Sequence, residues 1–232
     1  MIQLIETLVL IGGLTVSFQD DTKNRILEAA GAVFADKGYN AATVREICTR
    51  ASANLAAVNY HFGDKRRLYV EAIRRAHQSR VEQAPLPQWP PGTSPQRKLA
   101  DFIRTLLSRM LVEDGVSWHT QLMLREIAHP DSACEELVAD YIRPQFDVLQ
   151  RILGEMLPSD VGQERRHLIA FSIVGQCLHY RVAGKVVRML VPREEYEGYT
   201  PERLAVHITA LTLAALGFEP AICDASAMEA AS

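Results

Sequence analysis

The stretch TVREICTRASANLAAVNYHFGDK, which runs from Thr43 to Lys65, predicts two short helices joined by a tight turn. It begins with capping-box spacing: the hydroxyl of Thr43 can accept a hydrogen bond from the backbone amide of Glu46, and the Glu46 side chain can reach back. Apolar residues then recur at helical spacing until residues 52–54 interrupt the pattern. The spacing resumes over residues 55–62, so we expect a second helix of barely two turns.

A longer helix on each side of this stretch completes a small module. Apolar spacing predicts a helix over residues 22–37, capped by Asp21 or Thr22 and ended by Gly38, which can adopt a left-handed conformation. A further helix is expected to start after Asp64, whose side chain can cap it.

Positive charge is concentrated in the same module. Residues 22–80 contain eleven Lys or Arg and five Asp or Glu, a net charge of +6, whereas the whole chain carries −3. The near-neutral total argues against a protein that coats nucleic acid without selectivity. A short capped helix, a turn and a second short helix within a basic module form the arrangement that places one helix in the major groove of DNA.

The rest of the chain also shows helical spacing, so the expected fold class is all-α. The sequence PLPQWPPG at residues 85–92 cannot continue a helix, because each proline removes an amide donor and clashes with the preceding turn. Residues 186–191 have a strand-like composition but no partner strand, so we expect a helix end or a loop there. The predicted organisation is an N-terminal extension, a DNA-binding domain, a linker, an effector-binding and dimerisation domain, and a tail: 1–20, 21–83, 84–93, 94–219 and 220–232.

Later helices are predicted from apolar spacing and helix-start signals. They cover about 95–111, 118–129 and 132–157, and Pro144 is expected to kink the last of these. The stretches 162–184 and 200–217 are apolar on nearly all sides, which indicates burial on more than one face and favours a dimer interface. The expected dimer seam pairs residues 169–180 with 204–216, where Ala205, Ala210, Ala214 and Ala215 would let helices approach closely.

Composition and spacing exclude several other classes of protein. The cysteines, Cys48, Cys134, Cys177 and Cys223, stand far apart without CxxC or zinc-finger spacing, which indicates reduced thiols in a cytoplasmic protein. Residues 1–18 lack a basic start and are broken by two glycines, so neither a signal peptide nor a membrane span is expected. No nucleophile triad, phosphate loop or nucleotide fingerprint is present, and we expect neither an enzyme nor a cofactor.

Two other functions remain open on the residues alone. Glu126-Ile-Ala-His129 and Glu164-Arg-Arg-His167 share the Glu-x-x-His spacing of di-iron carboxylate bundles. That site would also need a glutamate from each of two further helices, and the arginines after Glu164 indicate an exposed turn. The second alternative is a dimeric adaptor that does not bind DNA, in which charge reversal at Lys65 would change nothing.

The basic module contains, in order, Ile26-Leu-Glu-Ala-Ala30, Phe34, Gly38, Ala42-Thr43, Glu46-Ile47, Ala51, Tyr60-His-Phe62 and Lys65. This order of residues resembles the TetR family of transcriptional repressors. The stretches 54–63, 124–130 and 141–144 are similar to the CecR-like subgroup of the family. The turn at residues 51–54 reads ASAN where the family usually has AGVS, and Asn59 stands where most relatives have tyrosine. A relative's operator sequence therefore cannot be transferred to this chain.

Candidate DNA contacts follow from the chemistry of the side chains in the module. Phosphate oxygens accept hydrogen bonds from backbone amides at helix starts and from hydroxyl, imidazole and ammonium groups. The expected phosphate contacts are therefore Thr43, Tyr60, His61 and Lys65. Base edges are expected to be read by an arginine, by two asparagines and by small apolar groups that touch thymine methyls, namely Arg45, Asn54, Leu55, Ala56, Ala57 and Asn59.

The resemblance implies a homodimer that binds double-stranded operator DNA at a palindromic site, most simply as a repressor, and that a small-molecule effector releases. Its C-terminal helices would then enclose a pocket. Polar and aromatic residues that could line such a pocket are Trp118, Gln121, Arg125, Tyr141, Phe146, His179 and Tyr180. No metal, cofactor or membrane enters this scheme.

Overall fold

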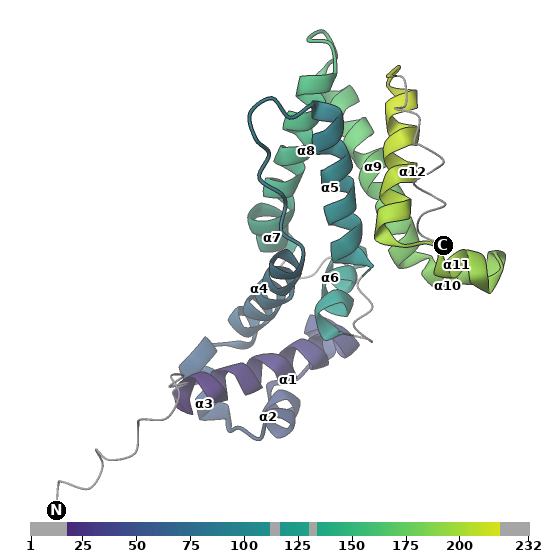
Figure 1. The fold of residues 1–232 in the computed structure, drawn as a ribbon. Coiled ribbons are helices and arrows are strands. Elements are labelled where there is room, and N and C mark those ends of the chain that lie inside the picture. The colour runs from purple at the N-terminus through teal and green to yellow at the C-terminus, as the bar shows by residue number, and fades with distance from the viewer. Residues whose placement is uncertain (1–17, 112–116, 130–133, 219–232) are drawn as a thin grey trace, which may run out of the picture.

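The chain folds into helices, as its apolar spacing and capping residues predict. The computed structural model describes residues 18–111, 117–129 and 134–218, and every regular element in these ranges is helical (Figure 1). The expected all-α class is confirmed. The predicted C-terminal tail and all but three residues of the predicted N-terminal extension lie outside the described residues. None of the described helices is long and apolar enough to cross a membrane.

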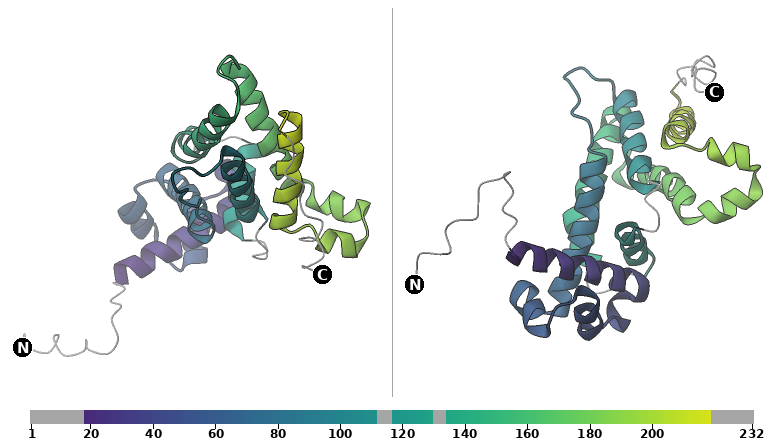
Figure 2. Two further views of the ribbon diagram at one scale, coloured as in Figure 1. Left: turned by 45° about the horizontal axis from the view of Figure 1, so that its top comes forward. Right: turned by 60° about the horizontal axis from the view of Figure 1, so that its bottom comes forward.

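The basic module consists of four helices at one end of the molecule. Helix α1 lies across α2 and α3, and α4 runs from this end toward the rest of the chain (Figures 1 and 2). The helices are α1 (Phe18–Ala41), α2 (Val44–Ala51), α3 (Leu55–Phe62) and α4 (Lys65–Gln83). The two short helices predicted from the sequence are therefore present, with eight residues each.

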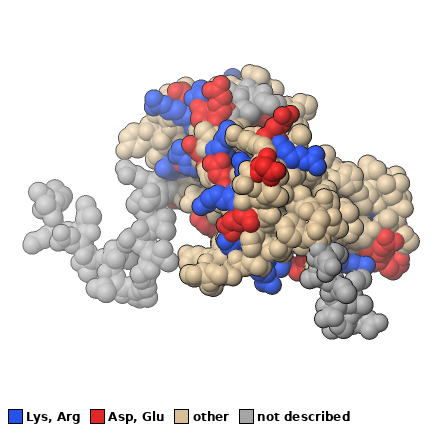
Figure 3. Space-filling view, turned by 90° about the horizontal axis from the view of Figure 1, so that it is seen from above, with Lys and Arg blue, Asp and Glu red and all other residues tan. Residues whose placement is uncertain are grey.

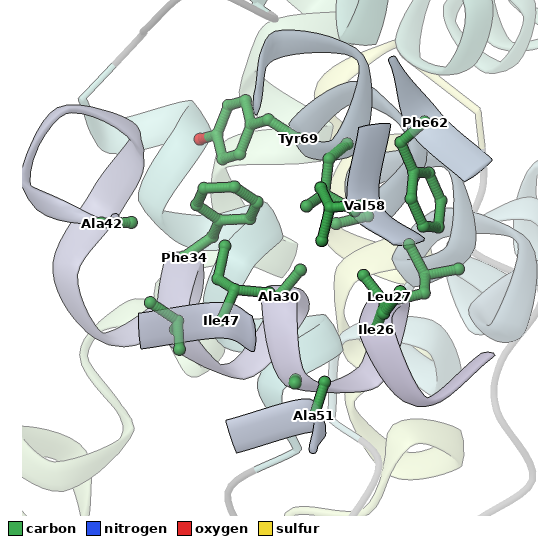
Figure 4. Packing of buried hydrophobic residues seen from close by; sticks show 14 of the residues in the cluster. Ile26, Leu27, Ala30, Phe34, Ala42, Ile47, Ala51, Val58, Phe62 and Tyr69 are labelled. Carbon is green, nitrogen blue, oxygen red and sulfur yellow. The ribbon is translucent and has the colours of Figure 1, made fainter. Parts of the chain in front are cut away.

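A shared apolar core holds the four helices of the module together. Ile26, Phe34 and Ile47 are completely buried, and Val58 of α3 is buried among them (Figure 4). Tyr69 of α4 meets Phe34 edge-on, with 4.7 Å between the ring centroids. Burial of each large side chain contributes about 1.5–3 kcal/mol relative to exposure, which is more than two-turn helices gain from their own hydrogen bonds.

The end of α1 differs from the prediction. Gly38 has a positive φ of 79°, but its ψ of 173° is extended rather than left-handed, and the chain resumes helical turns to Ala41. The amide of Ala42 donates to the Gly38 carbonyl at 3.2 Å, which closes this last turn. A Cβ at position 38 would lie 2.6 Å from the guanidinium of Arg125. Glycine suits this position because of its positive φ, and a side chain here would also require the end of Arg125 to move.

The capping box at the start of α2 forms only in part. The Thr43 hydroxyl accepts from the Glu46 amide at 3.2 Å, as expected. The Glu46 carboxylate does not reach back; it pairs with Lys37 Nζ of α1 at 2.6 Å. The expected reciprocal bond is thus replaced by a contact between two helices.

The turn between α2 and α3 depends on one strained residue. Ser52 has φ 50° and ψ 45° and is the only non-glycine residue with a positive φ in the described ranges. Its amide bonds to the carbonyls of Cys48 and Thr49, which closes α2. The left-handed conformation disfavours most side chains by about 1–2 kcal/mol. The turn therefore lowers the stability of the fold, while it sets the direction in which the chain leaves α2 and enters α3.

The larger domain packs its helices around a second core. Helix α5 runs beside α8, α9 and α12, and α10 and α11 project from one side (Figures 1 and 2). The elements are α5 (Pro95–Met110), α6 (Trp118–Ala128), α7 (Cys134–Leu137), the π-helical turn η1 (Val138–Ile142), α8 (Arg143–Met156), α9 (Gln163–Val182), α10 (Gly184–Leu190), α11 (Arg193–Glu197) and α12 (Pro201–Ala215). Leu99, Ile103, Leu107, Leu149 and Ile173 lie at the centre of this core.

The backbone of the structure shows the outcome of two local predictions, one for residues 186–191 and one for a kink at Pro144. Residues 184–190 form a helix, with Val187 buried and its amide bonded to the Ala183 carbonyl at 2.9 Å. Pro144 lacks an amide and its ring crowds the preceding turn. The helix before it accordingly widens into η1, where the Arg143 amide bonds to the Val138 carbonyl five residues back.

The two cores are not divided at the proline-rich segment. Helix α4 ends at Gln83 and α5 begins at Pro95, yet Leu122 of α6 and Leu137 of α7 are buried in the core of the basic module. The hydroxyl of Tyr69 in α4 donates to the Glu126 carboxyl in α6 at 2.5 Å, and both residues are buried. Helix α6 is therefore fixed to the basic module although it follows the linker in sequence.

We expect substitutions at Ser52 to follow the strain of its backbone. Ser52→Gly should leave the free energy of unfolding unchanged or raise it by up to about 1 kcal/mol, because glycine adopts a positive φ without strain. Ser52→Val should lower it by about 1–2 kcal/mol, because a β-branched residue is disfavoured there. Chemical denaturation measures both values, and equal stability of the two variants would contradict this account of the turn.

Tyr69→Phe tests the contact between α4 and α6. The substitution keeps the ring and removes one hydrogen bond from a fully buried carboxyl group, so the free energy of unfolding should fall by about 1–3 kcal/mol. Tyr60→Phe is the matched control, because Tyr60 is exposed, and it should be neutral. A Tyr69→Phe protein as stable as the Tyr60→Phe protein would show that this hydrogen bond does not hold α6 in place.

Candidate nucleic-acid interface

Helix α3 buries one face and exposes the other at the end of the molecule. Val58 and Phe62 point into the core of the basic module (Figure 4). Leu55 is 57% exposed and Tyr60 is 73% exposed, and Asn59 between these positions is also exposed. The open face of this two-turn helix therefore presents apolar and polar side chains that could contact another molecule.

The starts of three helices are capped at this end of the molecule. Thr43, Asn54 and Asp64 stand before α2, α3 and α4, and each side chain accepts a hydrogen bond from the amide three residues on. The capped helix starts bring backbone amides and the positive ends of helix dipoles to one surface. Such a surface can hold phosphate groups on either side of an inserted helix.

The structure gives the two predicted asparagines different surroundings. Oδ1 of Asn54 accepts from the Ala57 amide at 2.8 Å, so this side chain caps α3. The amide of Asn59 is exposed, and no side-chain partner is found for it within the described ranges. Asn59 is therefore the better placed of the two for a bidentate contact with an adenine edge.

Lys65 and the aromatic pair before it have partners within the module. Lys65 Nζ lies over the Tyr39 ring, 4.5 Å from its centroid, which holds the ammonium group near the start of α4. The rings of Tyr60 and His61 meet edge-on, with centroids 5.0 Å apart. All of the predicted contact residues thus belong to α2, α3 and the helix starts of one module, and the structure brings them to one end of the chain. Their roles in contacting DNA remain predictions.

Helix α2 adds two residues that the sequence analysis did not select. Thr49 and Arg50 line an open surface depression together with Thr43 and Arg45. The Thr49 hydroxyl donates to the Arg45 carbonyl at 3.0 Å, one turn earlier. The available sequence signal was the i, i+4 spacing between Arg45 and Thr49, which places both on one face of a helix.

The predicted effector-pocket residues are not brought together. Trp118 and Arg125 of α6 contact α1: Trp118 Nε1 donates to the Glu28 carboxylate at 2.8 Å, and Arg125 donates to the carbonyls of Asp36 and Lys37 at 3.3 and 3.0 Å. Both therefore connect the larger domain with the basic module. Gln121 on the same helix is exposed.

The other predicted pocket residues lie in three further surroundings. Tyr141 accepts a hydrogen bond from Arg74 at 3.1 Å and packs on His77 of α4. Phe146 stacks on Phe171 of α9. His179 is exposed on α9, and the neighbouring Tyr180 packs against Tyr199. These contacts belong to separate helix pairs, and an effector pocket lined by the seven residues stays a prediction.

Helices α9 and α12 expose an apolar face along the predicted dimer seam. Leu168, Phe171, Val206 and Leu211 are each between 48% and 59% exposed, and a groove of about 300 Å³ runs between the two helices. Seen from the end opposite the basic module, the surface on the side of α10–α12 carries few charged groups (Figure 3). One part of the prediction is wrong: Ala205 is only 3% exposed and faces the core of its own chain.

The two Glu-x-x-His motifs do not form a metal centre. Glu126 is buried and accepts from Tyr69, whereas His129 is exposed. Glu164 is exposed in the first turn of α9. Across residues 18–111, 117–129 and 134–218, no group of three or more His, Cys, Asp or Glu side chains could hold a metal ion.

Sequence comparison assigns both parts of the chain. Residues 26–72 match the family of bacterial regulatory proteins of the tetR type, and residues 95–216 match the C-terminal domain of the HTH-type transcriptional dual regulator CecR. CecR of Shigella flexneri is 24% identical over 72% of this chain and 79% of its own length. YttP of Bacillus subtilis, a probable HTH-type transcriptional regulator, is 24% identical over 66% of this chain and 70% of its own length.

Solved structures share the fold at lower sequence identity. AibR, solved in complex with isovaleryl coenzyme A and operator DNA, superposes with a TM-score of 0.57 at 19% identity, over 82% of this chain and 97% of AibR. A tetR-family regulatory protein from Rhodococcus reaches 0.59 at 22% identity, over 84% and 96% of the two chains. The matched family domains cover the basic module and the larger domain in turn. The chain therefore belongs to the TetR family, in the group with the CecR-type C-terminal domain, and is a DNA-binding transcriptional regulator rather than an enzyme.

Proposed function

We propose that the protein acts in the cytoplasm as a homodimeric repressor, which binds a palindromic operator and is released by a small-molecule effector. The observation that carries the DNA-binding part is the open face of α3, where Leu55, Asn59 and Tyr60 are exposed between capped helix starts. An α-helix fits the major groove, so these side chains would meet base edges while the helix starts on both sides meet phosphates.

The exposed apolar face of α9 and α12 supports the dimer. Its four large side chains stand in water when the chain is alone, and two-fold pairing would bury the same surface on both copies. A two-fold dimer presents two copies of α3. When these lie about 34–36 Å apart, they meet successive turns of one DNA face, and the preferred site is a palindrome.

Release by an effector would act through α4 and α6. Helix α4 belongs to the basic module at its start and reaches the larger domain at its end, and α6 is tied to α1 by Trp118 and Arg125. A ligand that shifts either helix would tilt α3 relative to its copy. It can release DNA only by binding the released form more tightly than the DNA-bound form. AibR, solved with isovaleryl coenzyme A and operator DNA, supports an effector in this fold.

The DNA-binding surface is tested on the DNA upstream of the protein's own gene, at several salt concentrations. Lys65→Ala should weaken binding to all sequences and lower the salt slope by about 1 for each subunit, because one phosphate contact is lost. Asn59→Ala should weaken only the preferred site, by about 1–3 kcal/mol, because a base contact is lost.

The matched control is Arg151→Ala, which removes an exposed cation of α8 and should leave both affinities unchanged. Circular dichroism confirms that each variant is folded. Equal binding of every sequence by the wild-type protein at all salt concentrations would contradict a sequence-specific regulator and favour an adaptor.

The dimer surface is tested by Leu211→Glu. A carboxylate at the centre of the exposed face of α12 would be buried without a partner, so the dimer dissociation constant should rise at least about 100-fold. Leu55→Glu is the control, because this leucine is equally exposed at the other end of the chain. Analytical ultracentrifugation measures both. A Leu211→Glu protein that remains as dimeric as the Leu55→Glu protein would remove this surface from the dimer.

A further inference from the structure

Helices α10 and α11 form an arm that projects from the end of α9. The arm comprises residues 184–197 and extends past α9 and α12, on the side away from α4 and α8 (Figures 1 and 2). Within the described residues, α10 packs mainly against α9 and α11. The arm therefore turns much of its surface to solvent when the chain is alone.

Aromatic contacts fix the direction of the arm. Val187 of α10 is buried, and Cζ of Arg188 lies over the Tyr196 ring of α11, 4.8 Å from its centroid. The Tyr196 ring lies 6.0 Å from the Tyr199 ring, which in turn lies 6.1 Å from the ring of Tyr180 in α9, measured between centroids. The arm is thus held in place before it binds anything, so little conformational entropy is lost when its surface is covered.

The outer face of α10 is apolar and exposed. Val186, Met189 and Leu190 are between 57% and 86% exposed, and their spacing of three and four residues places them on one face of the helix. Met189 is the most exposed of the large apolar residues in the described ranges. A cluster of large apolar side chains in water is typical of a surface that binds another protein or a membrane.

This face continues an exposed stripe on α9. Positions 168, 171, 175, 179 and 182 are all exposed and repeat every three or four residues, so they lie on one side of the helix. Leu168 and Phe171 belong to the proposed dimer surface, and Val182 ends the stripe at 72% exposed. Ala183 alone separates α9 from α10, so Val186 lies about one turn beyond Val182. A molecule that covers the end of the stripe therefore lies next to the arm.

The dimer surface of α9 and α12 is small by itself. An interface that buries roughly 800 Å² on each partner contains about 450–500 Å² of apolar area. A fully exposed large apolar side chain offers roughly 60–120 Å², so the four half-exposed side chains of this surface offer on the order of 200 Å². Val182 and the three side chains of α10 are more exposed and add on the order of 250 Å². The two surfaces together reach the area that a stable dimer needs.

The charge of the arm fits a second copy of the chain better than a membrane. Residues 184–197 contain three Lys or Arg and three Glu, so the arm is neutral overall. Helices that lie on anionic membranes carry mainly Lys and Arg on their polar face, whereas Glu194 and Glu195 in the first turn of α11 would be repelled there. A neutral arm meets its own copy without net repulsion.

We propose that the apolar face of the arm binds a second copy of this chain and extends the dimer surface beyond α9 and α12. The proposal rests on the proposed function, because it adds a segment to the homodimer described there. In a two-fold dimer both arms are covered, since each subunit contributes the same surface. The arm and Val182 then supply about half of the apolar area of the interface.

Sedimentation of the full chain without DNA, over a range of protein concentrations, tests the arm. The test variants are Val186→Glu and Leu190→Glu, which place a carboxylate on the outer face of α10. Leu55→Glu is the matched control, because Leu55 and Val186 are both 57% exposed and Leu55 lies at the DNA-binding end of the chain. Circular dichroism checks that each variant is folded.

Each arm variant should raise the dimer dissociation constant at least about tenfold, because both copies of the new carboxylate lose their hydration in the interface. Leu55→Glu should leave the dissociation constant unchanged. Folded arm variants that dimerise as tightly as the Leu55→Glu protein would overturn the proposal.

Flotation with vesicles of phosphatidylglycerol and phosphatidylethanolamine tests the other occupant. Wild-type binding to these vesicles that Leu190→Glu abolishes, with the dimer unchanged, would show that a membrane covers the arm and would overturn the proposal. We expect no flotation of either protein.

Leu211→Glu, measured in the same way, separates the arm from the proposed function. A dimer weakened by Leu211→Glu but not by the arm variants refutes the arm alone. A dimer weakened by the arm variants but not by Leu211→Glu supports the arm and removes the face of α9 and α12 from the interface. A wild-type protein that stays monomeric at every concentration refutes both the arm and the homodimer of the proposed function.

Discussion

Helices of eight residues are too short to be stable alone in water, and this constraint shapes the DNA-binding end of the molecule. Helices α2 and α3 persist because their inner faces enter one core with α1 and α4. The same packing fixes which residues point outward. Val58 and Phe62 must face the core, and Leu55, Asn59 and Tyr60 are consequently presented to solvent. The surface that we assign to base contacts is therefore a consequence of how the module achieves stability.

The core of the basic module also includes residues of the larger domain. Leu122 and Leu137 complete it from beyond the linker, and the buried Tyr69–Glu126 hydrogen bond joins α4 to α6. Helices α6 and α7 are therefore the parts of the larger domain whose displacement would reach the basic module directly. At the other end of α4, Arg109 at the end of α5 donates to the carbonyl of Ala84, the residue that follows the helix. One helix thus connects the larger domain with the surface that we assign to DNA.

Local signals in the sequence were sufficient for the elements of the module, because caps and apolar spacing act over a few residues. The starts of α2, α3 and α4 follow Thr43, Asn54 and Asp64. Long-range contacts were not predictable in this way. The pairing of Glu46 with Lys37 replaced half of the capping box. Arg125, selected as a pocket residue, instead bonds to the end of α1. Nothing in the spacing of the chain indicates that contact.

In the dimer that we propose, two copies of α3 enter neighbouring major grooves on one face of DNA. Hydroxyl-radical footprinting of the protein on the DNA upstream of its own gene measures this geometry directly. The protected patches should be related by two-fold symmetry, with half-site centres about 10–10.5 base pairs apart. A single unpaired patch, or even protection without symmetry at saturating protein, would contradict it.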